Sequence, residues 1–423
     1  MGAHPSRRAF LGGVASASFA AGDAPRPNVL VFFGDQESAL LPGPARLPHR
    51  RRIEERAVRF THAFCNTPQC SAARSSLLTG LEPHRTGVWT NVDASSLGKP
   101  LPASIPNLGS VFRKAGYATG YFGKWHLGND GTGLDAYGFS VYQRGKDEAV
   151  AGMAAEWIRA QRSSWLACVS VVNPHHIYDF PKLMKSVKPR EGVKPPVMGV
   201  DNLAGKPAEQ RQYMDKDQGA IASGYTPQDW IRYRSYYLEL VEKVDACLGA
   251  VLDAVDLANT VVVFTSDHGD ALGEHGLPFK GPFLYEENVR IPLLIAAPGL
   301  GKGERDDMVT QADVAPTVAS LAGVGWPAAV AGINLARRRG LARRRGARDG
   351  VFLEYYAKQK WVNPIRTLRT RRWKLNWYNS GGQELYDLAA DPHETRNLAR
   401  DAAFGKIRKE LEARIDGWRA PVS

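Results

Sequence analysis

Two polar pairs in the sequence, Asp35-Gln36 and Asp267-His268, each follow directly on an apolar run. Together they offer three oxygen donors and one imidazole, a set that suits a hard or borderline divalent cation. An aspartate at a strand end is often only a turn former or a helix cap, so neither pair is informative by itself. Because both pairs follow apolar runs, a metal site is the favoured interpretation. The histidine shifts the choice slightly from Ca²⁺ toward Mn²⁺ without excluding Ca²⁺.

A second set of side chains supplies positive charge and hydrogen-bond donors: Arg74, Lys124, His126, His175 and Lys280. Five such groups around one cation would repel one another unless an anion lay among them. A tetrahedral oxyanion, sulfate or phosphate, meets that requirement, because arginine binds it bidentately and lysine acts as a point charge. Lys280 by itself is equally well explained as a solvated loop lysine. In GKWHLG that explanation is weaker, since Trp125 would bury one face while Lys124 and His126 point to the other.

Cys70 opens the stretch CSAARSSLLTG, which reads as a short helix that ends at Gly80 and carries Arg74 near its start. A helix N-terminus and a guanidinium both favour an anionic group at this position. One interpretation is a thiolate nucleophile that attacks a phosphoryl or sulfuryl centre. The other is a buried structural thiol, and composition and spacing do not choose between them.

These residues are far apart in the chain and need a fold that brings them together. Five runs rich in Val, Ile, Leu and Phe indicate strands buried on both faces of a mainly parallel sheet: NVLVFFGDQ, GYATGYFGKWHLG, WLACVSVVNPHH, TVVVFTSDHGD and RIPLLIAAPG. Helices separate them, a short one in IPNLGSVFRKAG and a long one over 227–255. The sequence therefore predicts an α/β layered fold, in which polar residues that follow strands converge at the carboxyl edge of the sheet.

Both ends of the chain differ from this pattern. From about residue 350, alternating aromatic-rich runs and turns predict a small antiparallel sheet and a closing helix. We expect a catalytic domain over 25–345 and a small C-terminal subdomain over 346–423. Residues 1–24 carry Arg7-Arg8, a weakly apolar stretch and small residues, the order of a twin-arginine export signal. The alternative is a tail with a chance arginine pair; the signal predicts a periplasmic or extracellular protein.

The composition is that of a globular protein, with 423 residues of which 43% are hydrophobic and 23% charged. No apolar run reaches eighteen residues, so no membrane insertion is expected. Much of the net charge of +12 lies in an arginine-rich stretch at 337–348. We interpret it as a solvated loop and not as a nucleic-acid site, because no aromatic residues or binding module accompany it. Cys65, Cys168 and Cys247 cannot all form disulfides if Cys70 has another role, and the last two read as core thiols.

The motif CSAARSSLLTG followed by GKWHLG resembles the type I sulfatase family of the alkaline-phosphatase-like superfamily. The resemblance extends over nearly all of the mature chain, through PNVLVFFGDQ, VNPHHIY, SDHGDALGEHGLPFKGPFLYEENVRIPLLI, QADVAPTVASLAGV and ELYDLAADPHETRNLA. It implies an alkaline-phosphatase-like fold and hydrolysis of sulfate esters. A sulfated carbohydrate is the first expectation, with small aryl or alkyl sulfates behind it.

In that family the motif cysteine is oxidised after translation to Cα-formylglycine, so the resemblance implies that Cys70 is an aldehyde precursor and that a maturation enzyme is a partner. One hydroxyl of the aldehyde hydrate attacks sulfur and expels the alcohol. The other then loses its proton, expels sulfate and regenerates the aldehyde. A twin-arginine signal fits this scheme, since that route carries folded proteins and oxidation can precede export.

The resemblance also implies one divalent cation, Ca²⁺ first, with Mn²⁺ or Mg²⁺ as alternatives. Its ligands by resemblance are Asp35, Gln36, Asp267, His268 and the modified Cys70. Arg74 matches the arginine that steadies the hydrate. A metal-bound hydroxyl is more acidic than a free one, which makes attack feasible near neutral pH.

The remaining roles follow from the same resemblance. Lys124 and Lys280 match contacts to sulfate oxygens. His126 matches the histidine that helps to remove the hydrate proton, and His175 the one near the leaving oxygen. The order of residues in NPHHIY favours His175 over His176.

Two departures keep alternatives open. Ala72 stands where the commonest motif has proline, and the metal pairs are Asp-Gln and Asp-His instead of Asp-Asp and Asp-Asn. Such pairs also occur in relatives resembling phosphonate monoester hydrolases and choline sulfatases. The first alternative is therefore a phosphodiesterase or phosphonate monoester hydrolase. The second is a non-catalytic sulfoglycan-binding protein in which Cys70 is never converted.

Overall fold

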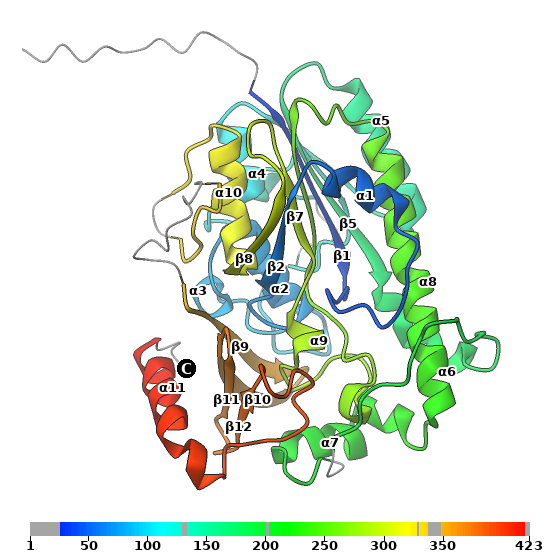
Figure 1. The fold of residues 1–423 in the computed structure, drawn as a ribbon. Coiled ribbons are helices and arrows are strands. Elements are labelled where there is room, and N and C mark those ends of the chain that lie inside the picture. Colours follow the sequence, from blue (N-terminus) through cyan, green and yellow to red (C-terminus); the bar gives the residue numbers. More distant parts are fainter. Residues whose placement is uncertain (1–25, 129–132, 200–202, 328–329, 337–347, 419–423) are drawn as a thin grey trace, which may run out of the picture.

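The computed structural model describes residues 26–128, 133–199, 203–327, 330–336 and 348–418. The predicted export signal and most of the arginine-rich stretch lie outside these ranges. The described chain forms a large sheet between two layers of helices and a second, smaller sheet near the C-terminus (Figure 1). Among the described residues, no helix has both the length and the apolar character that crossing a membrane requires.

The large sheet has eight strands in the order β4-β3-β5-β1-β6-β7-β2-β8. In that order their bounds are Val141–Gln143, Ala118–Gly123, Trp165–Pro174, Asn28–Asp35, Thr260–Ser266, Leu293–Ala296, Val58–Phe64 and Gly303–Thr310. All neighbours pair in parallel except β7, which runs antiparallel to β6 and β2. The predicted mainly parallel sheet is thus confirmed, and each of the five apolar runs contains one of its strands.

Helices bury both faces of this sheet. Helices α5 (Asp147–Ala160), α8 (Pro227–Leu252) and α1 (Pro48–Glu54) cover one face, and α2 (Cys70–Thr79), α4 (Leu108–Lys114) and α10 (Val314–Leu321) cover the other (Figure 1). The central strand β1 shows why its run is uninterrupted. Val29, Val31 and Phe33 pack into the second layer, while Leu30 and Phe32 pack into the first.

The helices begin and end where the local sequence allows it. Thr226 and Asp229 form a reciprocal capping box at the start of α8, with Pro227 as its first residue. Gly80 closes α2 with a φ of 71°, a left-handed conformation that glycine adopts without strain. The remaining short helices are α3 (Pro83–Thr86), α6 (Phe180–Leu183), α7 (Ala208–Lys216) and α9 (Glu286–Val289).

The smaller sheet is antiparallel, in the order β12-β11-β10-β9. Its strands are β9 (Gly350–Lys358), β10 (Trp361–Thr370), β11 (Trp373–Tyr378) and β12 (Gln383–Asp387), and α11 (Gly405–Trp418) packs on it through Leu411 and Ile415. The predicted C-terminal sheet and closing helix are confirmed. The domain boundary predicted at 345/346 lies outside the described residues and stays a prediction.

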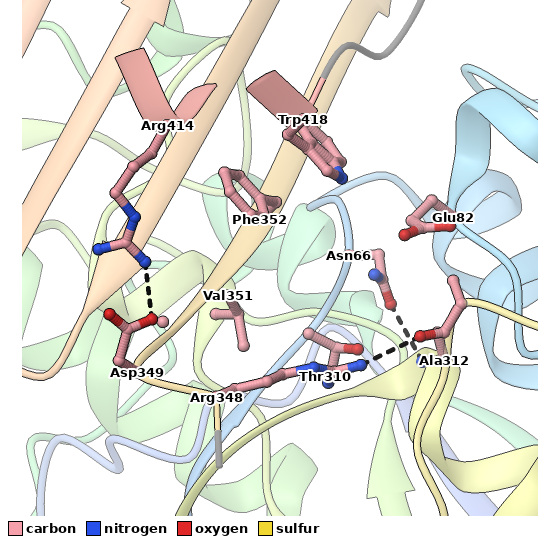
Figure 2. A pocket seen from close by; sticks show the side chains of 12 residues that line it. Asn66, Glu82, Thr310, Ala312, Arg348, Asp349, Val351, Phe352, Arg414 and Trp418 are labelled. Atoms are coloured by element: carbon pink, nitrogen blue, oxygen red, sulfur yellow. Dashed lines mark hydrogen bonds and ion pairs between the residues drawn. The ribbon is translucent and has the colours of Figure 1, made fainter. Parts of the chain in front are cut away.

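A pocket of about 250 Å³ lies where α11 and β9 meet the larger domain (Figure 2). Its charged side chains are paired with other groups of the protein. Arg414 contacts Asp349 at 2.7 Å, and Arg348 contacts the buried Asp313 at 2.7 Å. Figure 2 also shows Asn66 directed at the backbone of Ala312. The pocket is therefore part of the junction between the sheets.

Candidate active site

The register of the large sheet brings four of the predicted residues to one edge. Strands β1 and β6 stay in register to their ends, so Asp35 and Asp267 emerge side by side. Asp35 also lies opposite the last residue of β5, directly ahead of His175. Strand β3 is in register with β5 and leads into Lys124. In Figure 1, the carboxyl ends of β1 and β5 point toward the C-terminal sheet.

Cys70 is the first residue of α2, and its side chain meets this edge from the neighbouring helix layer. Its Sγ atom lies 3.3 Å from His268 Nε2 and 3.6 Å from Asp35 Oδ1. Ligand atoms of Asp35, Cys70, Asp267 and His268 all lie within 4.8 Å of one another, and all four side chains are buried. The structure thus brings together four of the five residues predicted to bind the cation.

The fifth predicted ligand, Gln36, is held in place by its amide nitrogen and has a side-chain oxygen without a hydrogen-bond donor among the described residues. Its Nε2 donates to Asp270 Oδ2 at 2.7 Å, while its buried Oε1 accepts no hydrogen bond from any described residue. His268 Nδ1 lies 2.8 Å from the carbonyl oxygen of Gly269, which holds a proton on Nδ1 and directs Nε2 toward Cys70. Carboxylate oxygens, an amide oxygen and an imidazole nitrogen are suitable donors for Ca²⁺ or Mn²⁺, so the residues fit the predicted cation.

Arg74 positions the two carboxylates. It is fully buried, and it donates from Nε to Asp267 Oδ2 and from the outer nitrogen Nη2 to Asp35 Oδ2, both at 3.0 Å. Its other outer nitrogen, Nη1, donates to Ser170 Oγ at 2.7 Å and to the carbonyl oxygen of Lys124. The fork therefore holds the Oδ2 atoms of Asp35 and Asp267 and leaves their Oδ1 atoms on the side of His268. The sequence pattern groups Arg74 with the side chains that could bind an oxyanion. In the structure its guanidinium instead donates to the two aspartates, Ser170 and the carbonyl oxygen of Lys124.

Two lysines surround the Cys70 side chain with positive charge. Lys280 Nζ lies 2.7 Å from Cys70 Sγ and 2.8 Å from His268 Nε2, and Lys124 Nζ lies 2.5 Å from Asp35 Oδ2. Burial raises the pKa of the Cys70 thiol, but the charges of Lys124 and Lys280 outweigh it and hold this pKa well below its usual value. The position occupied by Sγ is thus built to carry negative charge.

The histidines lie on the open side of the cluster. A hydrogen bond from His126 contributes to the lowered pKa of Cys70, and His126 Nε2 lies 3.9 Å from Asp93. His175 contacts Cys70 as well, and burial lowers the pKa of His175, which favours the neutral imidazole. His176 is exposed and pairs instead with the Asn173 side chain at 3.0 Å. The structure therefore places His175, and not His176, beside the predicted nucleophile.

Two residues of the active-site cluster have strained backbone conformations. Gln36 has a φ of 76° and His126 a φ of 58°, a left-handed conformation that is costly for residues other than glycine. Both residues follow strand ends, and both present a side chain to the cluster.

Sequence reasoning missed two supporting residues. Asp270 orients Gln36, and Tyr233 of α8 donates to Asp270 Oδ1 at 2.9 Å. Asp270 belongs to the sequence SDHGD and follows Asp267 by three residues, and this short spacing could have indicated that it lies near the metal donors. Tyr233 carried none, because it lies on the apolar face of a long helix, where an aromatic residue is ordinary packing.

The β9–β10 hairpin of the C-terminal sheet contacts the start of the helix that carries Cys70. The residue that precedes Cys70, Gln69, donates from Nε2 to Tyr355 Oη at 3.1 Å and to the carbonyl oxygen of Ala357 at 3.3 Å. Next to the hairpin, Trp89 and Tyr356 stack with their ring centroids 5.5 Å apart and line an apolar cavity of about 350 Å³. An extended apolar surface thus lies beside the active-site helix.

A second, polar cavity of about 310 Å³ at the same hairpin is lined by Lys216, Lys358 and Lys360. Lys358 is 7% exposed and lies 3.0 Å from Asp217. Burial lowers the pKa of Lys358 to about 8 against the opposing effect of Asp217, and the positive charge of Lys280 contributes to this shift. Lys358 therefore lies within electrostatic range of the cluster.

Comparisons with known proteins agree with this geometry. The model of the Sulfatase family matches residues 27–324, and the model described as N-sulphoglucosamine sulphohydrolase, C-terminal, matches residues 273–420. A Delta 4,5-hexuronate-2-O-sulfatase of Bacteroides thetaiotaomicron is 29% identical over 399 residues, which cover 86% of this chain and 82% of that protein. A choline-sulfatase of Rhizobium meliloti is 28% identical, with coverage of 89% and 83%.

Solved structures share the fold. A 2-O GAG sulfatase superposes with a TM-score of 0.81 at 24% identity, over 93% of this chain and 92% of the other. The phosphonate monoester hydrolase of Agrobacterium radiobacter gives a TM-score of 0.78 at 23% identity, over 93% and 96%. The predicted alkaline-phosphatase-like architecture is confirmed.

Proposed function

The chain belongs to the sulfatase family and is a sulfuric ester hydrolase, and we propose that it acts on a sulfated carbohydrate through a formylglycine hydrate at position 70 and a bound divalent cation. One observation carries the proposal. Cys70 Sγ lies among a set of metal donors and is surrounded by Lys124, Lys280 and two histidines. A sulfate ester brings its own negative charge to that position.

The residues of the chain divide the reaction among them. Asp35, Gln36, Asp267 and His268 would hold the cation, which when bound lowers the pKa of the attacking hydroxyl. Lys124 and Lys280 bind and orient the sulfate oxygens and balance the charge that develops on them. Arg74 holds the carboxylates of Asp35 and Asp267, two of the proposed metal ligands, in place through their Oδ2 atoms.

Proton transfer falls to the two histidines of the open side. His175, whose lowered pKa favours the neutral form, must carry a proton to assist departure of the alcohol oxygen, and a bound anion next to it favours that protonated form. His126 accepts the proton of the remaining hydroxyl, and Asp93 at 3.9 Å is placed to stabilise the resulting imidazolium.

The substrate class is proposed from the mouth of the site and from the relatives. Stacked aromatic rings and apolar surface suit the faces of a sugar ring, and the lysine-lined cavity suits a further anionic group on the same molecule. Among similar proteins are a Delta 4,5-hexuronate-2-O-sulfatase and a solved complex with D-glucosamine-2-N,6-O-disulfate.

The decisive experiment compares matched sulfate esters, phosphodiesters and phosphonates on matured protein, followed by a panel of sulfated monosaccharides and disaccharides. We expect kcat/KM to be highest for a sulfated sugar. A clear preference for the phosphodiester or phosphonate would replace this proposal with the phosphonate monoester hydrolase alternative.

Mass analysis of the peptide that contains Cys70 tests the chemistry separately. Conversion to formylglycine removes about 18 Da, because the thiol is replaced by a carbonyl oxygen. An unmodified thiol in turning-over protein would overturn the hydrate mechanism, and an unmodified, inactive protein that still binds sulfated glycans would support the binding-protein alternative.

We also propose that the protein is exported through its N-terminal twin-arginine sequence. Replacement of Arg7 and Arg8 by lysine should retain the protein in the cytoplasm of an expressing bacterium, as measured by fractionation. Unchanged secretion of that variant would remove the proposal.

A further inference from the structure

A second group of metal-ligating side chains lies outside the catalytic cluster. It consists of Glu274 in the short turn Glu274–Gly276, Glu287 in α9, and His393 in the loop that follows β12. One ligand atom from each lies within 4.8 Å of the others, and Glu274 Oε2 is 4.0 Å from His393 Nδ1. None of the three residues belongs to the set that surrounds Cys70.

Glu287 is the unusual member of this group. Glu287 is 7% exposed, and its carboxylate accepts a hydrogen bond from its own backbone N–H but forms no ion pair with any other described residue. The carboxylates nearest to it in electrostatic effect, Glu274 and Glu394, repel it further. A buried carboxylate without a neighbouring cation is costly, and a bound cation would offset both the desolvation cost and the repulsion.

Glu274 and His393 are arranged to complete such a site. Arg234 pairs with Glu274 Oε1, and the backbone nitrogen of Val197 donates to Oε2 at 2.9 Å, so this carboxylate is held in one orientation. The side chain of His393 is 50% exposed, which gives an ion a route from solvent and gives the ring freedom to rotate. A fixed carboxylate, an unpaired carboxylate and an adjustable imidazole thus meet at one point.

We propose that Glu274, Glu287 and His393 bind a divalent transition-metal ion of the Zn²⁺ type. Two carboxylate oxygens and one imidazole nitrogen are suitable Zn²⁺ ligands, and solvent would complete a tetrahedral shell. Zinc–ligand distances of about 2.0–2.2 Å require the three atoms to close by roughly 1 Å, which the exposed His393 ring can supply.

The position of the site gives the ion a structural role. Glu274 and Glu287 belong to the segment 267–289, which also carries His268 and Lys280, whereas His393 belongs to the C-terminal part of the chain. The ion would therefore link the segment that carries catalytic residues to the C-terminal sheet. Metal binding at such a link stabilises the folded state, and the stabilisation grows with the logarithm of the affinity.

The test counts metal ions on the full chain. Protein stripped with a chelator is incubated with Zn²⁺, freed of excess by gel filtration and analysed by elemental mass spectrometry. We expect Glu287→Gln and His393→Ala each to retain one Zn²⁺ fewer per chain than the wild type. The Zn²⁺-dependent rise in melting temperature should also be smaller in both variants.

Glu304→Gln is the matched control, since Glu304 is an exposed glutamate that pairs with Arg59 at the surface. It should bind as much Zn²⁺ as the wild type. Equal zinc content in the wild type and in both folded variants would overturn the proposal and would leave Glu287 as a protonated, buried carboxyl. The measurement does not depend on sulfatase turnover, so it stands apart from the proposed function.

Discussion

The active-site cluster and the junction between the two sheets both bury ionised side chains, but they balance those charges differently. At the junction, Arg369 pairs with Glu286 through two nitrogens at 3.0 and 2.9 Å. Lys374 Nζ contacts Glu286 at 2.8 Å, Glu394 at 2.7 Å and the carbonyl oxygen of Leu284 at 2.8 Å. Every donor of that ammonium group has a protein partner.

The active site is arranged in the opposite way. Arg74, Lys124 and Lys280 bring three positive charges to the two carboxylates of Asp35 and Asp267, and Lys280 contacts a thiol and an imidazole instead of a carboxylate. Burial would raise the pKa of Glu286, yet Lys374 and Arg369 hold that pKa below its usual range within a closed network. A closed network stabilises a junction, whereas a cluster with surplus positive charge is prepared for an anion.

We expect the largest effect from removing the Cys70 side chain at the centre of the active-site cluster. Cys70→Ala should reduce kcat by about 10³-fold or more, because no nucleophile can form there, while the melting temperature stays close to the wild-type value. Cys168→Ala in β5 is the matched control: it removes an equally buried free cysteine and should retain turnover. Comparable activity of both variants would contradict the assignment of Cys70.

Asp267→Asn tests whether metal and rate depend on the same residue. The change removes a ligand charge and weakens the pairing with Arg74, so we expect loss of bound metal and a fall of more than about 100-fold in kcat. Metal content and kcat are measured on the same preparation, with and without added Ca²⁺ or Mn²⁺. Full metal content alongside full activity would show that Asp267 is not a ligand.

Lys374→Met should separate stability from chemistry at the closed network. It leaves Glu286 and Glu394 buried without their shared cation, and we expect a loss of about 3–5 kcal/mol in the free energy of unfolding. Below the unfolding transition, kcat should remain within about twofold of the wild type. A large fall in kcat with unchanged stability, as measured by urea denaturation, would remove the contrast between the two regions.

Lys358→Gln tests the polar cavity at the β9–β10 hairpin. If Lys358 contacts a second anionic group on the substrate, KM for a doubly charged sulfated sugar should rise about tenfold, equivalent to about 1.4 kcal/mol. An otherwise neutral aryl sulfate serves as the internal control and should show little change. An equal effect on both substrates would assign Lys358 a purely structural role beside Asp217.

The smallest effect concerns the ion pair between His84 of α3 and Glu354 of β9, whose atoms lie 3.0 Å apart. Burial opposes protonation of His84, but the hydrogen bond and charge of Glu354 raise its pKa above the usual value of 6.5. The stabilisation is therefore complete below about pH 6.5 and is lost as pH rises through the raised pKa. The melting temperature of His84→Gln, compared with wild type between pH 5.5 and 8.5, should lack this decline; parallel curves would contradict it.

Much of the scaffold could be predicted because the burial of a strand or helix is reflected in the pattern of apolar residues along its own short sequence. The uninterrupted apolar run before Asp35 predicted β1, and Gly80 marked the end of α2, since each depends on a few adjacent residues. The metal donors were predictable as residue types that follow strands. The C-terminal sheet was visible as alternating aromatic runs from residue 350 onward.

The sequence by itself determined five of the eight strands of the large sheet, the helix that begins at Cys70 and the chemical nature of the side chains available. Only the tertiary structure decided that Arg74 holds the two aspartates and that Glu274, Glu287 and His393 meet. The reason is physical. Periodicity encodes which face of an element is buried, whereas side-chain direction and the meeting of distant segments depend on strand register and packing across the whole chain.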